Sequence, residues 1–384
     1  MNTLDDSRRR KVAILGATGS IGRNAVEVCK AFPERFEVVC VTCRNSENIL
    51  QDIANELLVK YRQVTDVPSA SNLRDEEELC ALLAGDDVDV VLCAIQGISA
   101  LRPVLAALRA GKTVCLATKE VLVAAGAWVM STARECGGRI LPVDSEHCAV
   151  FQCLHHEEPR ALRRILLTCS GGPFHAHPEL DLHSVTPEQA GHHPRWNMGA
   201  KITLDSATLM NKAFEVIEAA WLYGVPEDQI EVVIHPQALV HSMVEFQDGA
   251  VLAQLGPADM KLPIQYCLTY PERCPALMKP LDFTKAMRLD FAPPDEVRFP
   301  AISLARRVLR AGGLAGAVFD AANDAACRCF REGSLAFDQI VPAVASALDH
   351  TPPGQCDSLA ALEQAAAAAR EAVRRFAGKT SREP

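Results

Sequence analysis

The stretch Lys11–Gly22, KVAILGATGSIG, decides the fold of the first part of this chain. Its first half, Lys11–Leu15, is short and almost continuously apolar, as in a parallel strand that is buried on both faces. Its second half, Gly16–Gly22, is rich in glycine and opens the predicted helix Gly22–Ala31. Such a turn lets the backbone approach a pyrophosphate, which the N–H groups at the helix start then bind. The spacing is GxxGxxG rather than GxGxxG, so a glycine turn without a ligand stays an alternative.

The alternation of strand and helix patterns continues to about residue 143. Short runs of Val, Ile and Leu are separated by amphipathic stretches such as Ala100–Ala110 and Leu122–Glu135. This order is typical of a parallel sheet with helices on both faces. The fold class predicted for residues 1–143 is therefore α/β with a doubly wound, Rossmann-like parallel sheet. The further predicted strands are Phe36–Thr42, Val88–Ala94, Thr113–Ala117 and Arg139–Val143.

The end of the second predicted strand selects the cofactor. Domains that bind NAD usually carry a carboxylate there, about 20 residues after the glycine turn, for the ribose 2′-hydroxyl. Here the strand ends in Thr42-Cys43-Arg44-Asn45-Ser46, which holds an arginine and no acid. A guanidinium binds a 2′-phosphate through two hydrogen bonds, so NADPH is preferred over NADH. The alternative is that Arg44 is a solvated loop residue.

The remainder of the chain predicts two further domains. The part after residue 143 is rich in His, Pro and Gly and predicts a mixed α/β catalytic domain with a long helix over Ala207–Tyr223. The tail is helical, and its last helix is predicted to begin after Asp357 and Ser358 and to stop at Gly378. The predicted strands of the catalytic domain are Arg163–Cys169, Ile230–Ile234 and Ser242–Phe246. The predicted boundaries are 144–290 for the catalytic domain, 291–300 for a Pro-rich linker and 301–384 for the C-terminal helical domain.

The composition limits the partners and the compartment. A chain of 384 residues exceeds one ordinary core, so two or three domains are expected. The net charge of -9 argues against nucleic acid as the main partner, because binding a phosphate backbone needs a basic face. The 15 cysteines are odd in number and scattered, which favours a reducing cytosol. No stretch reaches the roughly 18 apolar residues of a membrane span, so we expect a cytoplasmic protein without a membrane partner.

Two acids, Asp144 and Glu146, follow the fifth predicted strand in Val143-Asp144-Ser145-Glu146-His147. Residues i and i+2 on an extended backbone point the same way, so these carboxylates are expected to converge. Crowded carboxylates repel unless a cation or a proton lies between them. All-oxygen ligation suits Mg²⁺ or Mn²⁺. A solvated acidic loop is the alternative.

The segment DSATLMNKAFE, which begins at Asp205, predicts the start of a helix with Asp205 or Ser206 as its N-cap. Asn211 and Glu215 are four residues apart and Lys212 and Glu215 three apart, so all three share one helix face. An amide, an ammonium and a carboxylate on one face suit a polar ligand. The alternative is a capped surface helix with an ordinary Lys–Glu pair.

Three further segments add candidates. Ser170-Gly171-Gly172 exposes amides and a hydroxyl after a strand and predicts an anion nest, although a plain glycine turn fits equally well. The loop 191–200 carries Trp196 and Met198 and predicts a lid over the substrate, with packing on a neighbouring helix as the alternative. Lys119 follows the fourth predicted strand, at the end where parallel sheets bind ligands. Its alternative is a solvated helix residue.

Read in order, these segments resemble the motifs of the 1-deoxy-D-xylulose 5-phosphate reductoisomerase family. The motifs are GATGSIG, TKE, PVDSEH, SGGPF, HPRWNMG, KITLDSATLMNKAFE and IHPQALVHSMVEFQDGAVLAQLG. The resemblance runs from about Lys11 to the C-terminus. It implies a homodimer that rearranges the carbon skeleton of this sugar phosphate and then reduces the aldehyde to 2-C-methyl-D-erythritol 4-phosphate. It also implies NADPH, a divalent ion (Mg²⁺, Mn²⁺ or Co²⁺), inhibition by fosmidomycin and a step of the non-mevalonate isoprenoid pathway.

The resemblance also implies roles for single residues at matching motif positions. The implied metal ligands are Asp144, Glu146 and Glu215, which are catalytic together with Lys119. The implied substrate-binding residues are Lys119, Ser145, Glu146, Ser170, His193, Trp196, Ser206, Asn211, Lys212 and Glu215. The implied cofactor-binding residues are Thr18, Gly19, Ser20, Ile21, Arg44, Asn45, Thr118, Glu120, Met198 and Gly199.

The chain departs from the family pattern at three positions. Cys43 stands where a glycine is usual, Thr118 where an asparagine usually precedes the lysine, and Ala200 where a basic residue is common. Because Cys43 and Thr118 lie on the cofactor side, single cofactor contacts are expected to differ there. Two other classes are alternatives to the family. An NADP-linked dehydrogenase without isomerase activity needs no site of three carboxylates, and a nucleotide-sensing regulator needs neither these carboxylates nor Lys119.

Overall fold

The computed structural model describes residues 8–67, 69, 71–192, 199–351 and 354–380. The chain folds into two compact units, each assembled from three separate stretches of sequence. The first unit comprises Met1–Val121, Val129–Cys148 and Asp259–Leu281. The second comprises Leu122–Trp128, Ala149–Ala258 and Asp282–Pro384. The domain boundaries 1–143, 144–290 and 301–384, with a linker at 291–300, stay a prediction.

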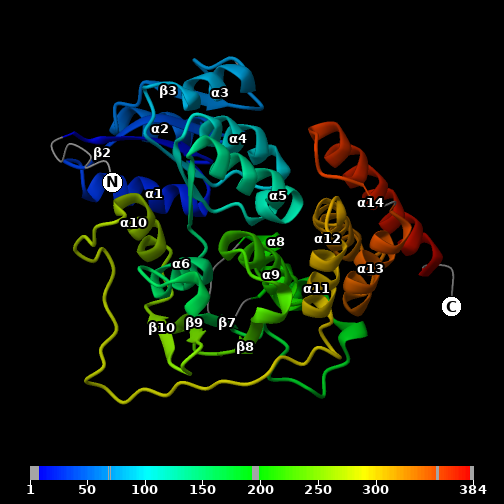
Figure 1. Ribbon diagram of the computed structural model, residues 1–384. Helices are drawn as coiled ribbons and strands as arrows, with labels where there is room; N and C mark the ends of the chain where they lie inside the picture. The colour runs from blue at the N-terminus through cyan, green and yellow to red at the C-terminus, as the bar shows by residue number, and fades with distance from the viewer. Residues whose placement is uncertain (1–7, 68, 70, 193–198, 352–353, 381–384) are drawn as a thin grey trace. The chain divides into compact units, whose positions relative to one another are not determined.

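A parallel sheet forms the centre of the first unit, in the strand order β3-β2-β1-β4-β5-β6. Figure 1 labels β2 and β3 of this sheet and the helices α1 to α5. The chain starts in the middle of this sheet, where Val12 of β1 lies opposite Val38 of β2 and Val90 of β4. The winding reverses between β1 and β4, and open α/β sheets bind ligands at the carboxyl ends of the strands at such a point. The strands are β1 (Arg10–Leu15), β2 (Phe36–Cys43), β3 (Tyr61–Val64), β4 (Val90–Cys93), β5 (Thr113–Leu116) and β6 (Arg139–Pro142).

The predicted doubly wound sheet is confirmed, and all five predicted strands are present. The strand β3 was not predicted, because its four residues YRQV contain only one aliphatic side chain. It pairs with β2 at the edge of the sheet. An edge strand needs less apolar surface than a central strand such as β1, whose residues Val12 to Leu15 are fully buried.

Helices surround this sheet, and one of them comes from much later in the chain. The helix α10 packs against α1, β5 and β6. Its residues Ile264 and Leu268 are fully buried, and the Arg10 guanidinium of β1 donates to the carbonyls of Leu268 and Tyr270, each at 3.0 Å. The helices of this unit are α1 (Ser20–Ala31), α2 (Glu47–Glu56), α3 (Glu76–Ala84), α4 (Leu101–Arg109) and α10 (Lys261–Thr269). The helices α5 (Lys119–Cys136) and α6 (Ser145–Cys153) each belong partly to the first unit and partly to the second.

The second unit contains a mixed sheet in the order β10-β9-β7-β8. The strand β7 runs parallel to β8 and antiparallel to β9, and β9 runs antiparallel to β10. Three of these strands were predicted, whereas β10 was not. Its apolar residues Val251 and Leu252 are 48% and 46% exposed, so β10 lacks the alternation of a half-buried strand. The strands are β7 (Leu162–Cys169), β8 (Ile230–Ile234), β9 (Val240–Phe246) and β10 (Val251–Leu255).

The predicted long helix Ala207–Tyr223 is present as α9 (Met210–Tyr223), which begins three residues later than predicted, and a separate helix, α8 (Ala200–Ala207), precedes it. The chain breaks at Leu209, which has a left-handed φ of 58°. The hydroxyl of Thr208 accepts a hydrogen bond from the Met210 N–H at 3.3 Å, so it helps to start α9. The predicted N-cap at Asp205 or Ser206 is wrong, because both residues lie inside α8.

The last part of the chain is helical, as predicted, and packs on α9 and α8. The rings of Phe214 and Phe319 lie 5.1 Å apart, centroid to centroid, in the buried core. Ser358 accepts a hydrogen bond from the Ala361 N–H at 3.2 Å, which confirms this cap of the last helix. Gly378 does not stop that helix, which continues to Thr380. The helices of this part are α11 (Ala301–Ala311), α12 (Ala315–Arg331), α13 (Ile340–His350) and α14 (Leu359–Thr380), and the short α7 (Pro187–Ala190) precedes α8.

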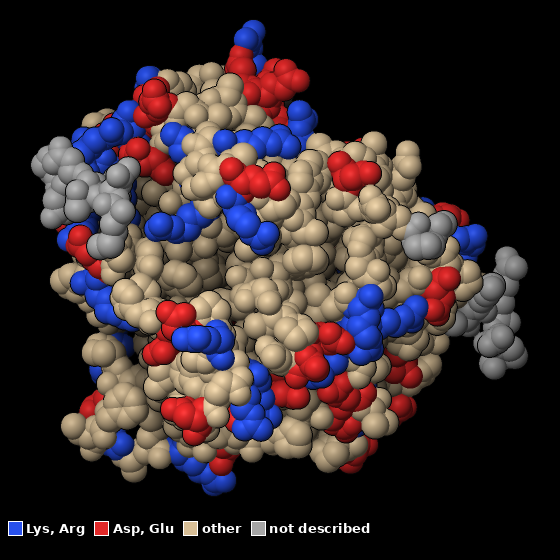
Figure 2. Space-filling view, in the orientation of Figure 1, with Lys and Arg blue, Asp and Glu red and all other residues tan. Residues whose placement is uncertain are grey.

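Short 3₁₀ segments complete the described structure. They are η2 (Ile98–Ala100), η3 (Pro159–Ala161), η4 (Leu182–Ser184), η5 (Glu227–Gln229) and η6 (Phe337–Gln339). Among the described residues, no helix combines the length and the apolar character needed to cross a bilayer. Lys and Arg side chains are interspersed with Asp and Glu on the face drawn in Figure 2.

Candidate active site

The glycine turn connects β1 to α1 through backbone contacts that exclude side chains. Gly16 has a φ of +85°, and a Cβ there would lie 2.6 Å from the carbonyl oxygen of Ala94. A Cβ on Gly22 would collide with the carbonyl oxygen of Gly16. Gly19, the N-cap of α1, caps the helix with no side chain, and Ser20 beside it is exposed. The turn therefore leaves the positive end of α1 open to an anion, as a pyrophosphate site requires.

Cys43, one of the three positions that depart from the family pattern, lies beside this turn. Its side chain is buried, and burial raises the pKa of the thiol above its usual 9.0, although hydrogen bonds with Ser46 and Thr18 oppose this shift. The thiol therefore stays protonated at neutral pH. Cys43 supplies a small uncharged side chain next to Thr18, at the position where the resemblance led us to expect a glycine.

Arg44 has a partner that the sequence did not reveal. Its Nε donates to Oδ2 of Asp66 at 3.1 Å, while 83% of its side chain is exposed. The Asp66 N–H donates to the Arg44 carbonyl at 2.8 Å, so the chain leaving β3 holds this acid beside the arginine. The end of β2 carries no acid, but the residues that follow β3 supply one. The signal was missed because β3 itself was not predicted.

The residues after β5 and β6 form a polar group at the carboxyl end of the parallel sheet. Lys119 donates from Nζ to Oδ2 of Asp144 at 2.7 Å, and the two side chains are only 11% and 13% exposed. The Thr118 hydroxyl donates to the Ile95 carbonyl at 2.5 Å, so this departure residue is fixed to the end of β4. Neighbouring parallel strands end at the same edge, which brings Lys119 and Asp144 together. The solvated alternative for Lys119 is therefore wrong.

Asp144 and Glu146 meet in a different way from the one predicted. The backbone is not extended here, because α6 begins at Ser145 and Glu146 lies in its first turn. The Glu146 N–H donates to Oδ1 of Asp144 at 3.2 Å, and the Ser145 hydroxyl donates to Oε2 of Glu146 at 2.5 Å. Asp144 thus lies at the start of a helix, where the free N–H groups stabilise a carboxylate.

In the second unit, α9 carries the predicted polar face. The Asn211 amide donates to Oε1 of Glu215 at 2.6 Å, and the Lys212 ammonium forms an ion pair with Oε2. Lys212 and Glu215 are 2% and 1% exposed. The alternative of an ordinary surface pair is therefore wrong. A buried ion pair adds little to stability compared with apolar residues of similar size, so burial at this position points to function.

The Ser170–Gly172 turn lies against the C-terminal part of α8. Gly171 and Gly172 have left-handed φ values of +88° and +69°. A Cβ on Gly172 would lie 2.7 Å from the carbonyl oxygen of Ser206, so only glycine permits this approach. The Gly172 N–H points to the Ser170 hydroxyl at 3.4 Å. Ser170 and Ser206, two of the implied substrate-binding residues, are therefore brought into one neighbourhood.

The lid residues His193, Trp196 and Met198 lie outside the described residues. Gly199, an implied cofactor residue, is the N-cap of α8 and is exposed. The remaining implied cofactor residues lie where the sheet ends. Thr18, Gly19, Ser20 and Ile21 belong to the glycine turn, Arg44 and Asn45 follow β2, and Glu120 lies in the first turn of α5.

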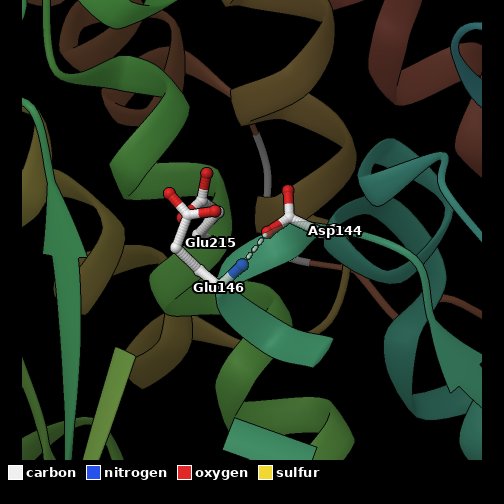
Figure 3. A group of neighbouring side chains, drawn as sticks. All are labelled: Asp144, Glu146 and Glu215. Atoms are coloured by element: carbon white, nitrogen blue, oxygen red, sulfur yellow. Dashed lines mark hydrogen bonds between the residues drawn. The ribbon is translucent and has the colours of Figure 1, made fainter. Parts of the chain in front are cut away.

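Three carboxylates form a group of neighbouring side chains (Figure 3). Asp144, Glu146 and Glu215 each offer one ligand oxygen, and these oxygens lie within 4.8 Å of one another. No His or Cys belongs to the group, so its donor atoms are all carboxylate oxygens. Such a set fits Mg²⁺ or Mn²⁺ better than Zn²⁺.

Three family models match this chain. A model described as 1-deoxy-D-xylulose 5-phosphate reductoisomerase matches residues 12–126. A model of the C-terminal domain of the same enzyme matches residues 140–223. A second C-terminal domain model of DXP reductoisomerase matches residues 255–372.

Whole proteins match over nearly the full chain. The 1-deoxy-D-xylulose 5-phosphate reductoisomerase of Cupriavidus necator is 46% identical, over 95% of this chain and 97% of its own length. The enzyme of the same name from Symbiobacterium thermophilum is 45% identical, over 95% and 98%. The Zymomonas mobilis enzyme solved with NADPH has a TM-score of 0.89 and 39% identity, over 96% and 99%. A DOX-P reductoisomerase solved with NADPH, fosmidomycin and magnesium has a TM-score of 0.90 and 33% identity, over 98% and 100%.

Proposed function

The chain belongs to the 1-deoxy-D-xylulose 5-phosphate reductoisomerase family, and from this premise we propose how its own residues divide the work of the family's reaction. The chain is an NADPH-dependent oxidoreductase that rearranges 1-deoxy-D-xylulose 5-phosphate and reduces the product to 2-C-methyl-D-erythritol 4-phosphate. The observation that carries the proposal is the group Asp144, Glu146 and Glu215, one member of which is paired with Lys119.

Asp144, Glu146 and Glu215 are the residues that hold the divalent ion. When bound there, Mg²⁺ or Mn²⁺ supplies Lewis-acid polarisation of the substrate's oxygens. The contacts of the three acids support this role, because each carboxylate is oriented by a donor. Lys119 holds Asp144, Ser145 holds Glu146, and Asn211 holds Glu215. Donors of this kind orient metal ligands in proteins and raise metal affinity about 10- to 100-fold.

Lys119 and Ser145 orient the substrate's carbonyl and hydroxyl oxygens. The Lys119 ammonium is almost buried, so its charge is weakly screened and favours negative charge that develops on a nearby oxygen. The Ser145 hydroxyl lies next to Glu146 at the start of α6, where it is placed to bind an oxygen near the ion. These two residues stabilise the charge that forms as the carbon–carbon bond shifts.

The phosphate group of the substrate is held by Ser170, Ser206, Asn211 and Lys212, together with His193. The Ser170–Gly172 turn and α8 place two hydroxyls in one neighbourhood, and α9 adds an amide and an ammonium. Holding the phosphate keeps the fragments together while a bond is broken and remade. Trp196 and Met198, which the family motif assigns to the lid, lie outside the described residues.

The glycine turn and Arg44 hold NADPH, which supplies the hydride. The turn offers the open N-terminus of α1 to the pyrophosphate, and the exposed Arg44 guanidinium binds the 2′-phosphate. Asn45, Thr118, Glu120 and Gly199 line the remainder of the cofactor. Asp66 occupies only Nε of Arg44, so both terminal nitrogens are in a position to face the phosphate.

One assay separates this function from its alternatives. The purified chain is mixed with NADPH and 1-deoxy-D-xylulose 5-phosphate, with and without Mg²⁺, and oxidation of NADPH is followed by its loss of near-ultraviolet absorbance. We expect turnover only when the ion is present and 2-C-methyl-D-erythritol 4-phosphate as the product. A dehydrogenase without isomerase activity would give a product with an unrearranged skeleton, and a regulator would consume no NADPH.

We also propose that the chain forms a homodimer in the cytoplasm. The exposed edge strand β10 supports the dimer, because Val251 and Leu252 leave apolar surface at a strand edge that can pair with a second copy. The compartment is supported by the cysteines, all 15 of which are free thiols. The acidic balance and the mixed charges in Figure 2 support the expectation that nucleic acid is not a partner.

A further inference from the structure

Asp205 carries a buried carboxylate inside α8 that none of the roles above uses. Asp205 is 3% exposed. Its Oδ2 accepts a hydrogen bond from Nζ of Lys201, one turn earlier in the same helix, at 2.7 Å. Its Oδ1 accepts from the side-chain amide of Asn323 at 2.8 Å. The Cys327 thiol, one turn further along α12 than Asn323, donates to the same oxygen at 3.5 Å.

These contacts join α8 to α12 through a charge that cannot be solvated. Asn323 is fully buried and Cys327 is 1% exposed, so both donors are already removed from water. Burial and the nearby charge of Asp205 raise the pKa of the Cys327 thiol well above 9.0, so the thiol keeps the proton that it donates. Removing one partner from a buried ion is strongly destabilising, because the ion then lacks compensation. The register of α8 on α12 is therefore fixed at this point.

On its opposite side, α8 contacts the Ser170–Gly172 turn. A Cβ on Gly172 would lie 2.7 Å from the Ser206 carbonyl oxygen and 3.3 Å from Cα of Ala207. Ser206 directly follows Asp205 in the helix. A shift of α8 would therefore open or compress the contact between Ser206 and the Ser170–Gly172 turn. The helix α8 lies between a fixed buried ion on one side and the turn on the other.

We propose that Asp205 is a positioning residue for the phosphate site: by joining α8 to α12 it holds Ser206 at its contact with the Ser170–Gly172 turn. This inference rests on the proposed function, in which Ser170 and Ser206 bind the substrate's phosphate. The oxygens of Asp205 bind Lys201, Asn323 and Cys327, so Asp205 acts through the position of α8 and not on the substrate.

The test compares the constants for substrate and cofactor in variants of the cross-helix contact. Asn323→Ala removes the donor from α12, whereas Asp324→Asn changes the neighbouring residue, whose side chain is 41% exposed and paired with Arg328, and serves as the control. For each variant we would measure kcat, the KM for the deoxyxylulose phosphate and for NADPH, and the inhibition constant of inorganic phosphate. We expect Asn323→Ala to raise the substrate KM and the phosphate constant about tenfold, with the NADPH KM unchanged.

A charge swap tests whether the cross-helix contact itself is responsible. Asp205→Asn combined with Asn323→Asp places the carboxylate on α12 and the amide on α8, so the hydrogen bond between the helices is kept. We expect Asn323→Asp alone to raise the substrate KM. The double variant should reverse most of that rise. If Asn323→Ala does not fold, Asn323→Ser, which keeps a short donor, replaces it and should show a smaller rise of the same two constants.

The outcomes separate this inference from the function on which it rests. Wild-type protein that fails to oxidise NADPH with this substrate contradicts the proposed function. Calorimetric binding of inorganic phosphate to wild type and Asn323→Ala then decides the role of Asp205. Weaker binding to the variant supports that role, and equal binding overturns it. Unchanged substrate and phosphate constants in a folded Asn323 variant would overturn the inference. An equal rise in the substrate and NADPH constants would also overturn it, because that result indicates a general loss of structure.

Discussion

Glu215 connects two parts of the site at the scale of one residue. Its oxygens bind Asn211 and Lys212, which we propose hold the phosphate, and it also belongs to the group of acids that we propose holds the ion. Asn211 and Lys212 lie one helical turn before it, so α9 presents all three together. In the proposed site, phosphate binding and the position of the ion are therefore coupled through one carboxylate.

The substitution Glu215→Gln tests this coupling. An amide nitrogen cannot ligate the ion and cannot accept the hydrogen bond from Lys212, so we expect kcat to fall at least about a hundredfold. The NADPH KM should stay near that of the wild type, whereas the unfolding temperature should fall, because the buried Lys212 ammonium loses its charged partner. Glu231→Gln, at a partly exposed position on β8, is the control. Near-normal turnover of Glu215→Gln at saturating Mg²⁺ would remove Glu215 from the ion's ligands.

We propose that Arg44 sets the preference between the two nicotinamide cofactors. Its replacement by glutamate adds a second carboxylate next to Asp66 beside the 2′-phosphate, and both acids repel that phosphate. We expect Arg44→Glu to raise the NADPH KM more than about tenfold and to leave the NADH KM within a factor of about two. The measurement is initial rates with each cofactor at saturating substrate. Equal losses with NADPH and NADH would contradict the 2′-phosphate role.

At the scale of elements, the close approach of the Ser170–Gly172 turn to α8 predicts a difference between two glycines. Gly172 and Gly249 both have left-handed φ values, +69° and +86°. A Cβ at Gly172 would meet Ser206, whereas a Cβ at Gly249 would have nothing within 4 Å. Backbone strain alone costs about 1 kcal/mol for alanine, and the contact adds to it only at Gly172.

We therefore expect Gly172→Ala to lower the free energy of unfolding by about 1–2 kcal/mol more than Gly249→Ala. It should also raise the substrate KM, which Gly249→Ala should leave unchanged. Denaturant unfolding and steady-state kinetics of the two variants measure these differences. Similar values for both glycines would mean that α8 moves aside without consequence for the phosphate site.

The pairing of β7 with β9 predicts a dependence of stability on pH. Hydrogen bonding from Arg164 and the nearby charge of Arg163 hold the pKa of Glu245 below its ordinary 4.5. A lowered pKa in the folded state stabilises the fold above the unfolded value, and this stabilisation is lost as pH falls through the folded pKa. We expect the difference in Tm between the wild type and Glu245→Gln to be full at neutral pH and to shrink below the ordinary glutamate pKa of about 4.5. A difference that stays constant with pH would indicate lost packing instead.

Elements with a strong apolar pattern could be predicted from the sequence, whereas those fixed by tertiary contacts could not. The strands β1 and β8 follow from continuous or alternating aliphatic residues. The break at Leu209 could not be predicted, because a leucine in a left-handed conformation has no local signal and is held by its buried surroundings. Asp205 was assigned to an N-cap on its residue type, but its partners Asn323 and Cys327 lie far along the chain.

The candidate site could be predicted largely because its motifs are long and specific to the family. Physical reasoning alone left Lys119, Glu215 and the Ser170–Gly172 turn open, since exposed and buried versions of such segments have the same sequence pattern. The structure decides between them by burial and by donor contacts. Asp66 was missed because the strand before it has a weak pattern and its partner Arg44 follows another strand.

At the scale of the whole molecule, the exposed edge of the second sheet predicts the state of association. Replacing Val251 and Leu252 by lysine adds charge to β10, which opposes pairing with a second copy. We expect the wild type to be dimeric and the double variant to be monomeric by size-exclusion chromatography with light scattering. Replacing Lys285, which is 77% exposed, by glutamate is the control. A monomeric wild type would contradict the proposed homodimer.

The return of α10 to the first sheet has a consequence for biosynthesis. When β1 to β6 have just emerged from the ribosome, the nascent chain still lacks α10, the helix that buries Ile264 and Leu268 against α1, β5 and β6. At about 5–20 residues per second, the roughly hundred or more residues between β6 and α10 delay that cover by several seconds. During this interval the nucleotide-binding half exposes an apolar face. A chaperone would therefore bind this face before synthesis of the enzyme is complete.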